Sequence, residues 1–309
     1  MDILHFLHRN GRSMAMPSGM ILGALLCRPI ASVDAMLHGM ITPTLIFLML
    51  FITFCRVDVR TMRLKPIHLW MLLFQFAFCP AVYFVLAPFN TVVAQGAMIC
   101  VLAPIAMAAV VIGGMLGANI VTMATFSLVC NMAVALVAPA FLATVGNGEC
   151  TFPEIMARVL PLLIGPFAAA QAVRKVMPAA SNWLGGHSQL SFYMWLISLT
   201  VVIGRTMVFI MEYPDADPTV EALMAVVAGV ICIVQFIVGR RIGRSYGDAV
   251  AGGQSLGQKN TVLAIWMAQS FLNPLSSIAP TAYIVWQNIV NSCQIYRHDK
   301  MEPEDKNKS

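Results

Sequence analysis

Apolar stretches long enough to cross a lipid bilayer follow one another along nearly the whole chain. Of its 309 residues, 59% are hydrophobic and only 11% are charged, whereas about 25% of the residues of a soluble domain carry charge. A soluble protein of this size would need far more polar surface. Because about 20 apolar residues in a helix span the hydrocarbon core, the sequence predicts an all-α membrane protein with ten spans, at residues 14–32, 38–55, 67–87, 92–115, 119–145, 155–174, 189–211, 220–240, 248–270 and 275–296.

The basic residues give these spans an orientation. With the N-terminus inside, fifteen of the 19 Lys and Arg residues fall in inner segments, and the outer loops hold only Arg28 and Arg158. This asymmetry is what the positive-inside rule expects. We therefore predict a multi-pass protein of the cell (inner) membrane with both termini cytoplasmic. The net charge of +5 marks loop orientation and gives no reason to expect a nucleic-acid partner.

The two ends of the chain carry weaker signals. The N-terminal segment lacks the apolar core and small-residue cleavage site of a signal peptide, so we expect it to stay attached. Residues 298–309, a polar C-terminal tail, are predicted to be disordered. The eight cysteines are scattered without metal-binding spacing and are predicted to act as small buried hydrophobes.

The most unusual stretch is residues 248–264, DAVAGGQSLGQKNTVLA. A lysine at the centre of a membrane helix costs about 2.5 to 3.5 kcal/mol on insertion scales. Lys259 lies about 16 Å from either end of its span by helix rise, which is too far for its side chain to reach the interface. Gly252, Gly253 and Gly257 loosen the same segment. We interpret it as a broken helix at a binding site.

Arg205, the other basic residue within a span, lies about six residues from the outer end of its helix. We expect its side chain to reach the interface or to pair with the acidic outer loop that contains Glu212, Asp215 and Asp217.

Ten spans divide into two halves of five, at about 14–145 and 155–296, and an odd number per half inverts the second half. The fourth span of the first half holds Pro104, Gly113 and Gly114, and the fourth span of the second half holds the glycines described above. Interrupted spans at corresponding positions indicate a transporter site. For the first interruption alone, close helix packing by glycine is a competing explanation.

One short internal echo accompanies this symmetry. The third span of each half contains a glutamine followed by a phenylalanine, Gln75–Phe76 in LLFQFAFCP and Gln235–Phe236 in CIVQFIVGR. Two residues alone carry little weight.

Several short motifs, in the same order and spacing over residues 39–297, resemble the bile acid:sodium symporter family: Gln75 to Pro80 (QFAFCP), Pro104, Gly117 to Asn119 (GAN), Gly257 to Asn260 (GQKN) and Val285 to Asn288 (VWQN). The resemblance implies a ten-helix fold of two inverted five-helix repeats, with spans four and nine broken and crossing. It also implies sodium-coupled uptake of organic anions, such as bile acids, pantothenate or small carboxylates.

The chain departs from this family at its sodium ligands. The family's serine–asparagine pair at the break in span four is Ala109–Val110 here, which offers no side-chain oxygen. Of the hydroxyl positions in span five, one is Met123 and the other is Ser127, which keeps its hydroxyl. We therefore expect no sodium at the family sites and no other metal.

The departures in span nine indicate which residue takes the place of the sodium ions. The family's glutamate is Ser255 here, and its glutamine is Lys259, while Gln75 and Asn260 are retained. We hypothesise that the Lys259 ammonium is a tethered cation that stands in for two sodium ions and a glutamate. Freed backbone carbonyls, together with Gln75, Gln258 and Asn260, would accept hydrogen bonds from its three donors.

The sequence thus predicts a secondary transporter of a small organic anion, independent of sodium. The site comprises Lys259, Gln75, Ser255, Gln258, Asn260 and Ser127, with helix hinges at Pro104, Gly113, Gly114, Gly252, Gly253 and Gly257. Uniport, exchange and proton coupling remain open. Two alternatives stand beside it, a non-transporting membrane sensor or partner-binding subunit on the same fold, and a sodium symporter with relocated ligands.

Catalysis and cofactors are not expected. The sequence has no nucleophile–base arrangement, nucleotide-binding loop or zinc pattern. The expected partners are the small-molecule substrate and the lipid bilayer. The oligomeric state is left open, with a monomer allowed.

Overall fold

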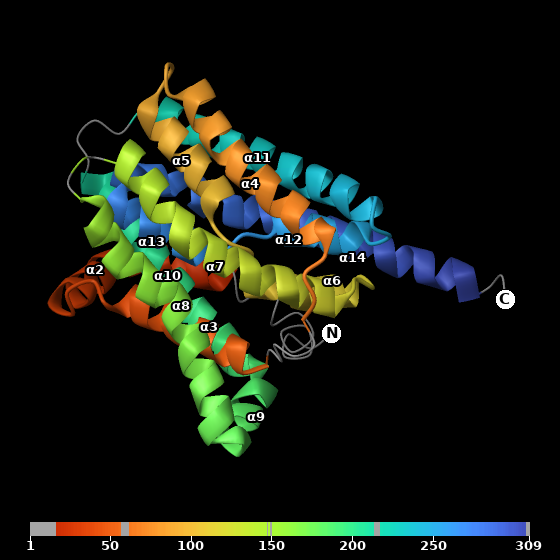
Figure 1. The fold of residues 1–309 in the computed structure, drawn as a ribbon. Coiled ribbons are helices and arrows are strands. Elements are labelled where there is room, and N and C mark those ends of the chain that lie inside the picture. The colour runs from red at the N-terminus through yellow and green to blue at the C-terminus, as the bar shows by residue number, and fades with distance from the viewer. Residues whose placement is uncertain (1–16, 57–61, 147, 149, 213–216, 307–309) are drawn as a thin grey trace, which may run out of the picture. The chain divides into compact units, whose positions relative to one another are not determined.

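The computed structural model describes residues 17–56, 62–146, 148, 150–212 and 217–306 and consists almost wholly of α-helices (Figure 1). Over these ranges the extended backbone amounts to one isolated bridge. Five helices are long and apolar enough to cross a membrane: α4 (Pro66–Leu86), α7 (Ile120–Val145), α8 (Phe152–Val176), the Tyr193–Glu212 part of α10 (Ser188–Glu212), and α11 (Pro218–Arg244). These helices support a multi-pass membrane protein.

A sixth span is present if two bent helices count as one. Pro17–Leu25 and α2 (Cys27–Met36) follow each other at an angle of 78°. The predicted number of ten spans is therefore not confirmed, since five or six elements meet the length and composition expected of a span.

The remaining predicted spans are helical but short, interrupted or partly polar. They correspond to α3 (Ile41–Arg56), α5 (Thr91–Leu102) with α6 (Met107–Met115), α12 (Ala249–Gly257) with α13 (Thr261–Phe271), and the 3-10 turn η2 (Pro274–Ser277) with α14 (Ile278–Lys306). A helix of 9 to 12 residues covers only about 14–18 Å. Each half of a broken span is thus about half the thickness of the hydrocarbon core, about 30 Å.

The chain forms two compact units, and the division falls within α8. The first unit comprises Met1–Val57 and Leu160–Ala216. In it, α10 packs against α2 and α3, and α3 packs against α9 (Pro178–Gly186). Phe54 and Phe167 meet edge to face, with ring centroids 5.5 Å apart. The Ser181 hydroxyl donates to the Cys55 carbonyl at 3.5 Å.

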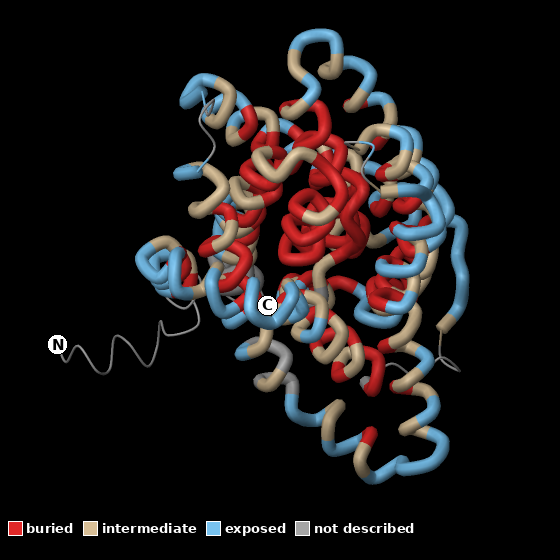
Figure 2. The backbone as a smooth tube through the Cα atoms, turned by 90° about the vertical axis from the view of Figure 1, so that its left-hand side faces the viewer, coloured by how far each residue is buried: buried red, intermediate tan, exposed pale blue. Residues whose placement is uncertain are grey.

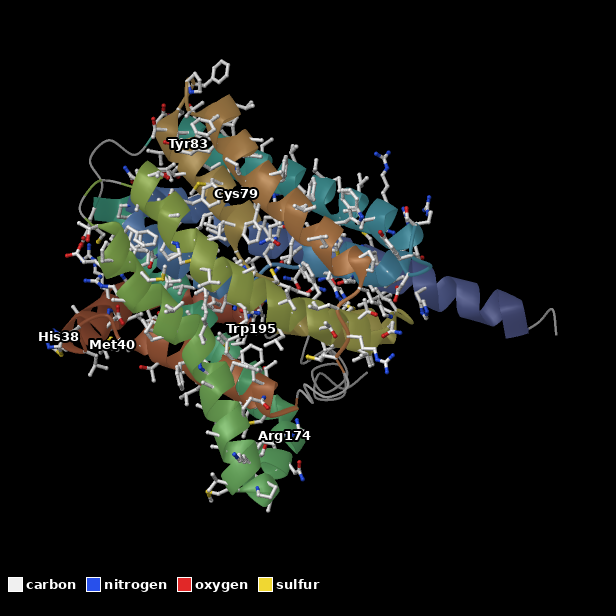
Figure 3. All side chains as sticks on the ribbon, in the orientation of Figure 1. His38, Met40, Cys79, Tyr83, Arg174 and Trp195 are labelled. Atoms are coloured by element: carbon white, nitrogen blue, oxygen red, sulfur yellow. The ribbon has the colours of Figure 1, made fainter. Side chains whose placement is uncertain are left out.

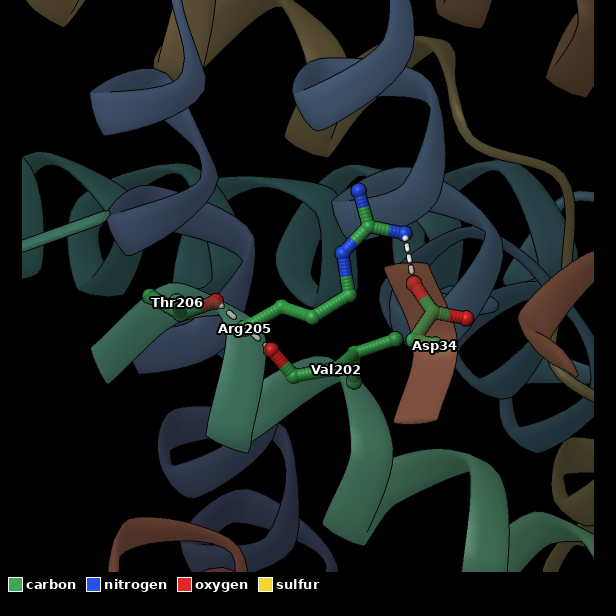
Figure 4. A network of polar contacts seen from close by, with 4 residues as sticks. All are labelled: Asp34, Val202, Arg205 and Thr206. Atoms are coloured by element: carbon green, nitrogen blue, oxygen red, sulfur yellow. Dashed lines mark hydrogen bonds and ion pairs between the residues drawn. The ribbon is translucent and has the colours of Figure 1, made fainter. Parts of the chain in front are cut away.

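Arg205 does not behave as the sequence predicted. Its Nη1 lies 3.0 Å from Oδ2 of Asp34 on α2, and Asp34 is only 4% exposed (Figure 4). One turn of α10 is further tied by Thr206, whose hydroxyl donates to the Val202 carbonyl. The ion pair holds the guanidinium against α2 within the first unit, whereas Asp215 of the predicted partner loop lies outside the described residues.

The second unit comprises Asp58–Val159 and Asp217–Ser309 and holds both broken helices. Nearly every described residue of α5, α12 and α13 is buried, and such buried coils are the red segments of Figure 2. Helices α11 and α12 pack backbone to backbone, because a Cβ at Gly239 would collide with the Gly252 carbonyl, and the reverse. Gly252 is therefore a packing point within α12.

The last helix is longer than expected. The sequence predicts a disordered tail over residues 298–309, but α14 continues as a helix to Lys306, and Figure 1 shows its end extending beyond the neighbouring helices of the unit. Residues 307–309 lie outside the described part of the chain.

Candidate functional site: the crossing of two broken helices

The interruptions of the fourth and ninth apolar stretches meet each other. The chain leaves the helix at residues 103–106 and again at 258–260, and Ile105 and Lys259 form an antiparallel bridge there. The Asn260 amide donates to the Pro104 carbonyl at 2.8 Å, and the Ala106 amide donates to the Gln258 carbonyl at 2.8 Å. Each break thus satisfies backbone groups that the other has freed, as an interior without water requires.

Proline explains the first break. Pro104 has no amide hydrogen, and its ring disfavours the helical conformation of the residue before it. Ala103 is accordingly extended, with ψ of 139°. The predicted hinge glycines lie elsewhere: Gly113 and Gly114 are inside α6, and Gly252, Gly253 and Gly257 are inside α12. Of the predicted hinges, Pro104 alone lies in a break.

The carbonyl end of α5 is closed by side chains from distant helices. Gln75 on α4 donates from Nε2 to the carbonyls of Leu102 and Ala103, at 3.0 and 3.2 Å. Its Oε1 accepts from the Cys130 thiol on α7 at 3.5 Å. All polar atoms of this buried amide are thereby engaged at the break, where the sequence placed it.

The second glutamine of the echo plays a matching part. Gln235 on α11 donates to the Cys100 carbonyl of α5 at 3.4 Å and to the Tyr283 hydroxyl at 3.0 Å. Tyr283 then donates to the carbonyl of Gly257, the last residue of α12, at 2.8 Å. One glutamine therefore serves the break after α5 directly, and the other reaches the break after α12 through a tyrosine.

Lys259 closes the remaining carbonyl of α5. The side chain is 1% exposed, and its Nζ donates to the Val101 carbonyl at 3.0 Å. The last carbonyls of a helix carry partial negative charge, which favours a cation at that position. The Lys259 amide donates to Oε1 of Gln287 on α14 at 3.0 Å, which fixes the backbone of the break.

The partners of the ammonium differ from the prediction in one respect. A backbone carbonyl accepts from Nζ as expected, but Gln75, Gln258 and Asn260 do not. Among the described residues, Val101 is its one hydrogen-bond acceptor and no carboxylate pairs with it. The ammonium has three donors, so it retains capacity for a further anionic or polar group.

Three cysteines of the helices around the crossing are buried, namely Cys79, Cys100 and Cys130. Cys79 lies on α4, one turn before Tyr83 (Figure 3), and its thiol lies 3.9 Å from the Met98 carbonyl. Six of the eight cysteines are buried, as predicted, whereas Cys150 is half-buried and Cys293 is exposed, so the prediction is wrong for Cys293. Over the described ranges, no three His, Cys, Asp or Glu side chains are placed to hold a metal ion.

A ladder of buried amides runs from the crossing along α12 and α14. Gln258 donates to Gln254 and, at 3.1 Å, to Asn291. Gln254 also contacts Asn291 and donates to Gln294 at 3.0 Å, and Arg240 donates to the same Gln294 oxygen at 3.3 Å. A spacing of three residues places Asn291 and Gln294 on one face of α14, and this spacing is visible in the sequence alone.

The two predicted serines lie near this region without a hydrogen bond to Lys259. Ser255 on α12 is 1% exposed, and its hydroxyl has no partner in the part of the chain that the structure describes. Ser127 is buried on α7, where its carbonyl accepts from the Asn131 amide at 2.7 Å. The structure therefore joins Gln75, Gln258, Lys259 and Asn260 at the crossing and leaves both hydroxyls outside its hydrogen bonds.

Two half-helices begin at the crossing, and only one of them has a side-chain cap at its first turn. The Asn260 side chain caps α13 by accepting from the Leu263 amide at 3.2 Å. At α6 the cap position is Ala106, which has no side-chain acceptor, and Ala108 in its first turn is exposed. The positive end of α6 is thus open to an external anion.

Neither the models of known protein families nor the curated proteins include a match to this chain. Its function is therefore argued from its sequence and geometry.

Proposed function

We propose that the protein is a secondary transporter of a small organic anion that works by alternating access, on the plan of the bile acid:sodium symporters. Sodium plays no part, and Lys259 is the fixed cation at the crossing. One observation carries this proposal: a lysine without a carboxylate partner among the described residues is held in the interior by the carbonyl end of a broken helix.

The replacement of a sodium ion by an ammonium is chemically reasonable at this position. Sodium needs several oxygen ligands, but the first turn of α6, directly after the first break, offers Ala109, which is fully buried, and Val110, and neither has a side-chain oxygen. The ammonium instead donates a hydrogen bond to the Val101 carbonyl and places a positive charge beside it, as a bound sodium ion would. It also repels a second cation at short range.

An anion fits the two positive features of the crossing. The Lys259 ammonium carries a full charge, and the uncapped start of α6 contributes partial charge and backbone donors. A carboxylate is the group that accepts from both kinds of donor. The proposed substrate of the protein is therefore a small organic anion.

The two ends of the second unit support the ten-span topology that this proposal includes. The starts of α4, α7 and α12, all on the predicted inner side, line one cavity. At predicted outer positions, Gln95 donates to the Val145 carbonyl at 2.7 Å and accepts from the Asn273 amide at 3.1 Å. Turns that the charge rule assigns to the same side thus meet. Cytoplasmic termini in the inner membrane follow from the same orientation.

Flux measurements test the proposal. Purified protein is first screened for thermal stabilisation by cholate, pantothenate and succinate, since a ligand of the folded state raises apparent stability. The compound that stabilises most is then radiolabelled and added to proteoliposomes in NaCl or in KCl. We expect uptake above protein-free liposomes at equal rates in both salts.

Two results would overturn the proposal. Binding without uptake would make the protein a sensor on the same fold. Faster uptake in NaCl than in KCl at equal ionic strength would show that sodium binds at other ligands, and the tethered-cation hypothesis would then be wrong.

A further inference from the structure

The cavity at the starts of α4, α7 and α12 lies away from Lys259. Its volume is about 660 Å³, and it is open to solvent along several exposed residues. Three segments that are far apart in the sequence line it. Lys65 comes from the start of α4, Gly117, Asn119 and Thr122 come from the start of α7, and Gly247 and Asp248 come from the start of α12.

Two glycine turns and one carboxylate build the walls. Gly117 and Gly247 have φ of 81° and 78°, which is the left-handed conformation that glycine adopts without strain. Asp248 joins the two turns, because its Oδ2 accepts from the Asn119 amide and its Oδ1 accepts from the Ala251 amide, each at 2.8 Å. Both oxygens of this carboxylate therefore already hold backbone donors.

Lys65 is the cation of the cavity and forms no ion pair with a described residue, while the Asp248 carboxylate lines the same cavity. Its Nζ makes a long hydrogen bond of 3.4 Å to the Thr122 hydroxyl, and no carboxylate pairs with it among the described residues. The side chain is exposed, whereas Thr122 is 6% exposed and forms the inner wall. Since Asp248 is engaged with backbone amides, the cavity presents a lysine and a hydroxyl to an incoming solute.

We propose that this cavity binds the anionic group, a carboxylate or a phosphate, of a small solute or of a lipid headgroup. Lys65 supplies the charge, and Thr122 supplies a neighbouring hydrogen bond. The site does not depend on transport at Lys259. It is connected to the crossing by α12, whose first turn lines the cavity and whose last residue, Gly257, is two positions before that lysine, about 14 Å along the helix.

Protection of Lys65 from acylation tests the site directly. The full-length protein in phosphatidylcholine nanodiscs is treated with a limiting acetylating reagent, with inorganic phosphate or with chloride at equal ionic strength. Peptide mass spectrometry then follows Lys65 and Lys175, an exposed lysine of the first unit that serves as the internal control. We expect phosphate to slow acetylation of Lys65 several-fold and to leave Lys175 unchanged.

A second arm separates a free solute from a lipid headgroup. The same reaction is run in phosphatidylglycerol nanodiscs with and without phosphate. If Lys65 is already protected there without phosphate, and added phosphate protects it no further, the occupant is a lipid headgroup. Protection by phosphate in both lipids supports a free solute. Equal acetylation of Lys65 under all four conditions would overturn the proposal.

A matched variant pair keeps the test independent of the crossing. Thr122→Val retains shape and removes the hydroxyl, so the protection of Lys65 should weaken, whereas Lys259→Gln should leave the protection intact. If Lys259→Gln abolished protection as well, the cavity would not be a separate site. Failure of transport in proteoliposomes would leave these results unaffected.

Discussion

The two broken helices cross at one point but contribute opposite chemistry. The break after α5 brings the last carbonyl oxygens of that helix to the crossing, and the first turn of α6 that follows it carries apolar side chains such as Ala109. The break after α12 supplies donors to that end of the first broken helix, with the Lys259 ammonium on the Val101 carbonyl and the Asn260 amide on the Pro104 carbonyl. In the contact made by the ammonium, the acceptor is therefore a carbonyl of the first broken helix and the cation belongs to the second.

Under the proposed function, this division would let a site replace a bound ion by a side chain and keep its geometry. A mobile cation would be held by oxygens from both breaks, whereas a side-chain ammonium has to come from one of them. Once Lys259 occupies that position, polar side chains at the first break have no cation to bind. The apolar Ala109–Val110 pair is consistent with that loss.

Removal of the lysine should have the largest effect on anion uptake. Lys259→Met keeps the length and apolar stem of the side chain but leaves the Val101 carbonyl without its donor. An unsatisfied buried acceptor costs about 1–3 kcal/mol, and anion uptake should fall to the level of empty liposomes. Uptake and the free energy of unfolding in SDS titration measure the two effects. Lys175→Met, at an exposed position, is the control. Undiminished uptake by Lys259→Met would remove the lysine from the mechanism.

The two glutamines should contribute differently to stability, although each is followed by a phenylalanine in the sequence. Gln75→Leu leaves the carbonyls of Leu102 and Ala103 unpaired, so we expect a loss of about 2–5 kcal/mol of unfolding free energy. Gln235→Leu removes a long bond of 3.4 Å to the Cys100 carbonyl and the bond of 3.0 Å to the Tyr283 hydroxyl, but Tyr283 still donates to Gly257, so the loss should be about 1–2 kcal/mol. Equal losses in SDS titration would contradict the asymmetry between the repeats.

The half-helices α6 and α12 should tolerate an added methyl group differently. Gly252→Ala places a Cβ against the Gly239 carbonyl, which cannot move without shifting α11, so about 1–3 kcal/mol should be lost. Gly114→Ala meets only the end of the Ile120 side chain at 3.2 Å, which can rotate away. Its effect should be within about 0.5 kcal/mol. Thermal unfolding of the two variants in the same detergent decides, and a larger loss at Gly114 would contradict this packing.

Much of this arrangement could be predicted from the sequence, because its signals are local. Pro104 marks a break by its own chemistry, and the cost of a buried charge singles out Lys259. Other features depend on partners that a single sequence does not reveal. The Asp34–Arg205 pair joins α2 to α10, and nothing near Arg205 in the chain indicates Asp34. The glycines of α12 predicted a hinge, but Gly252 serves helix packing, and local composition is the same for both roles.

The smallest effect tests the difference between the two caps. Ala106→Ser would give α6 the side-chain acceptor that Asn260 gives to α13, and a new cap of this kind stabilises by about 0.5–1 kcal/mol. The same hydroxyl would occupy amides that we assign to the anion, so uptake at low substrate concentration should decrease while the unfolding free energy rises. Asn260→Ala is the matched loss of a cap, and it should lower stability by a similar amount. If Ala106→Ser raised stability and left the concentration dependence of uptake unchanged, the start of α6 would be excluded from anion binding, and Lys259 would be left as the positive group of the crossing that recognises the substrate.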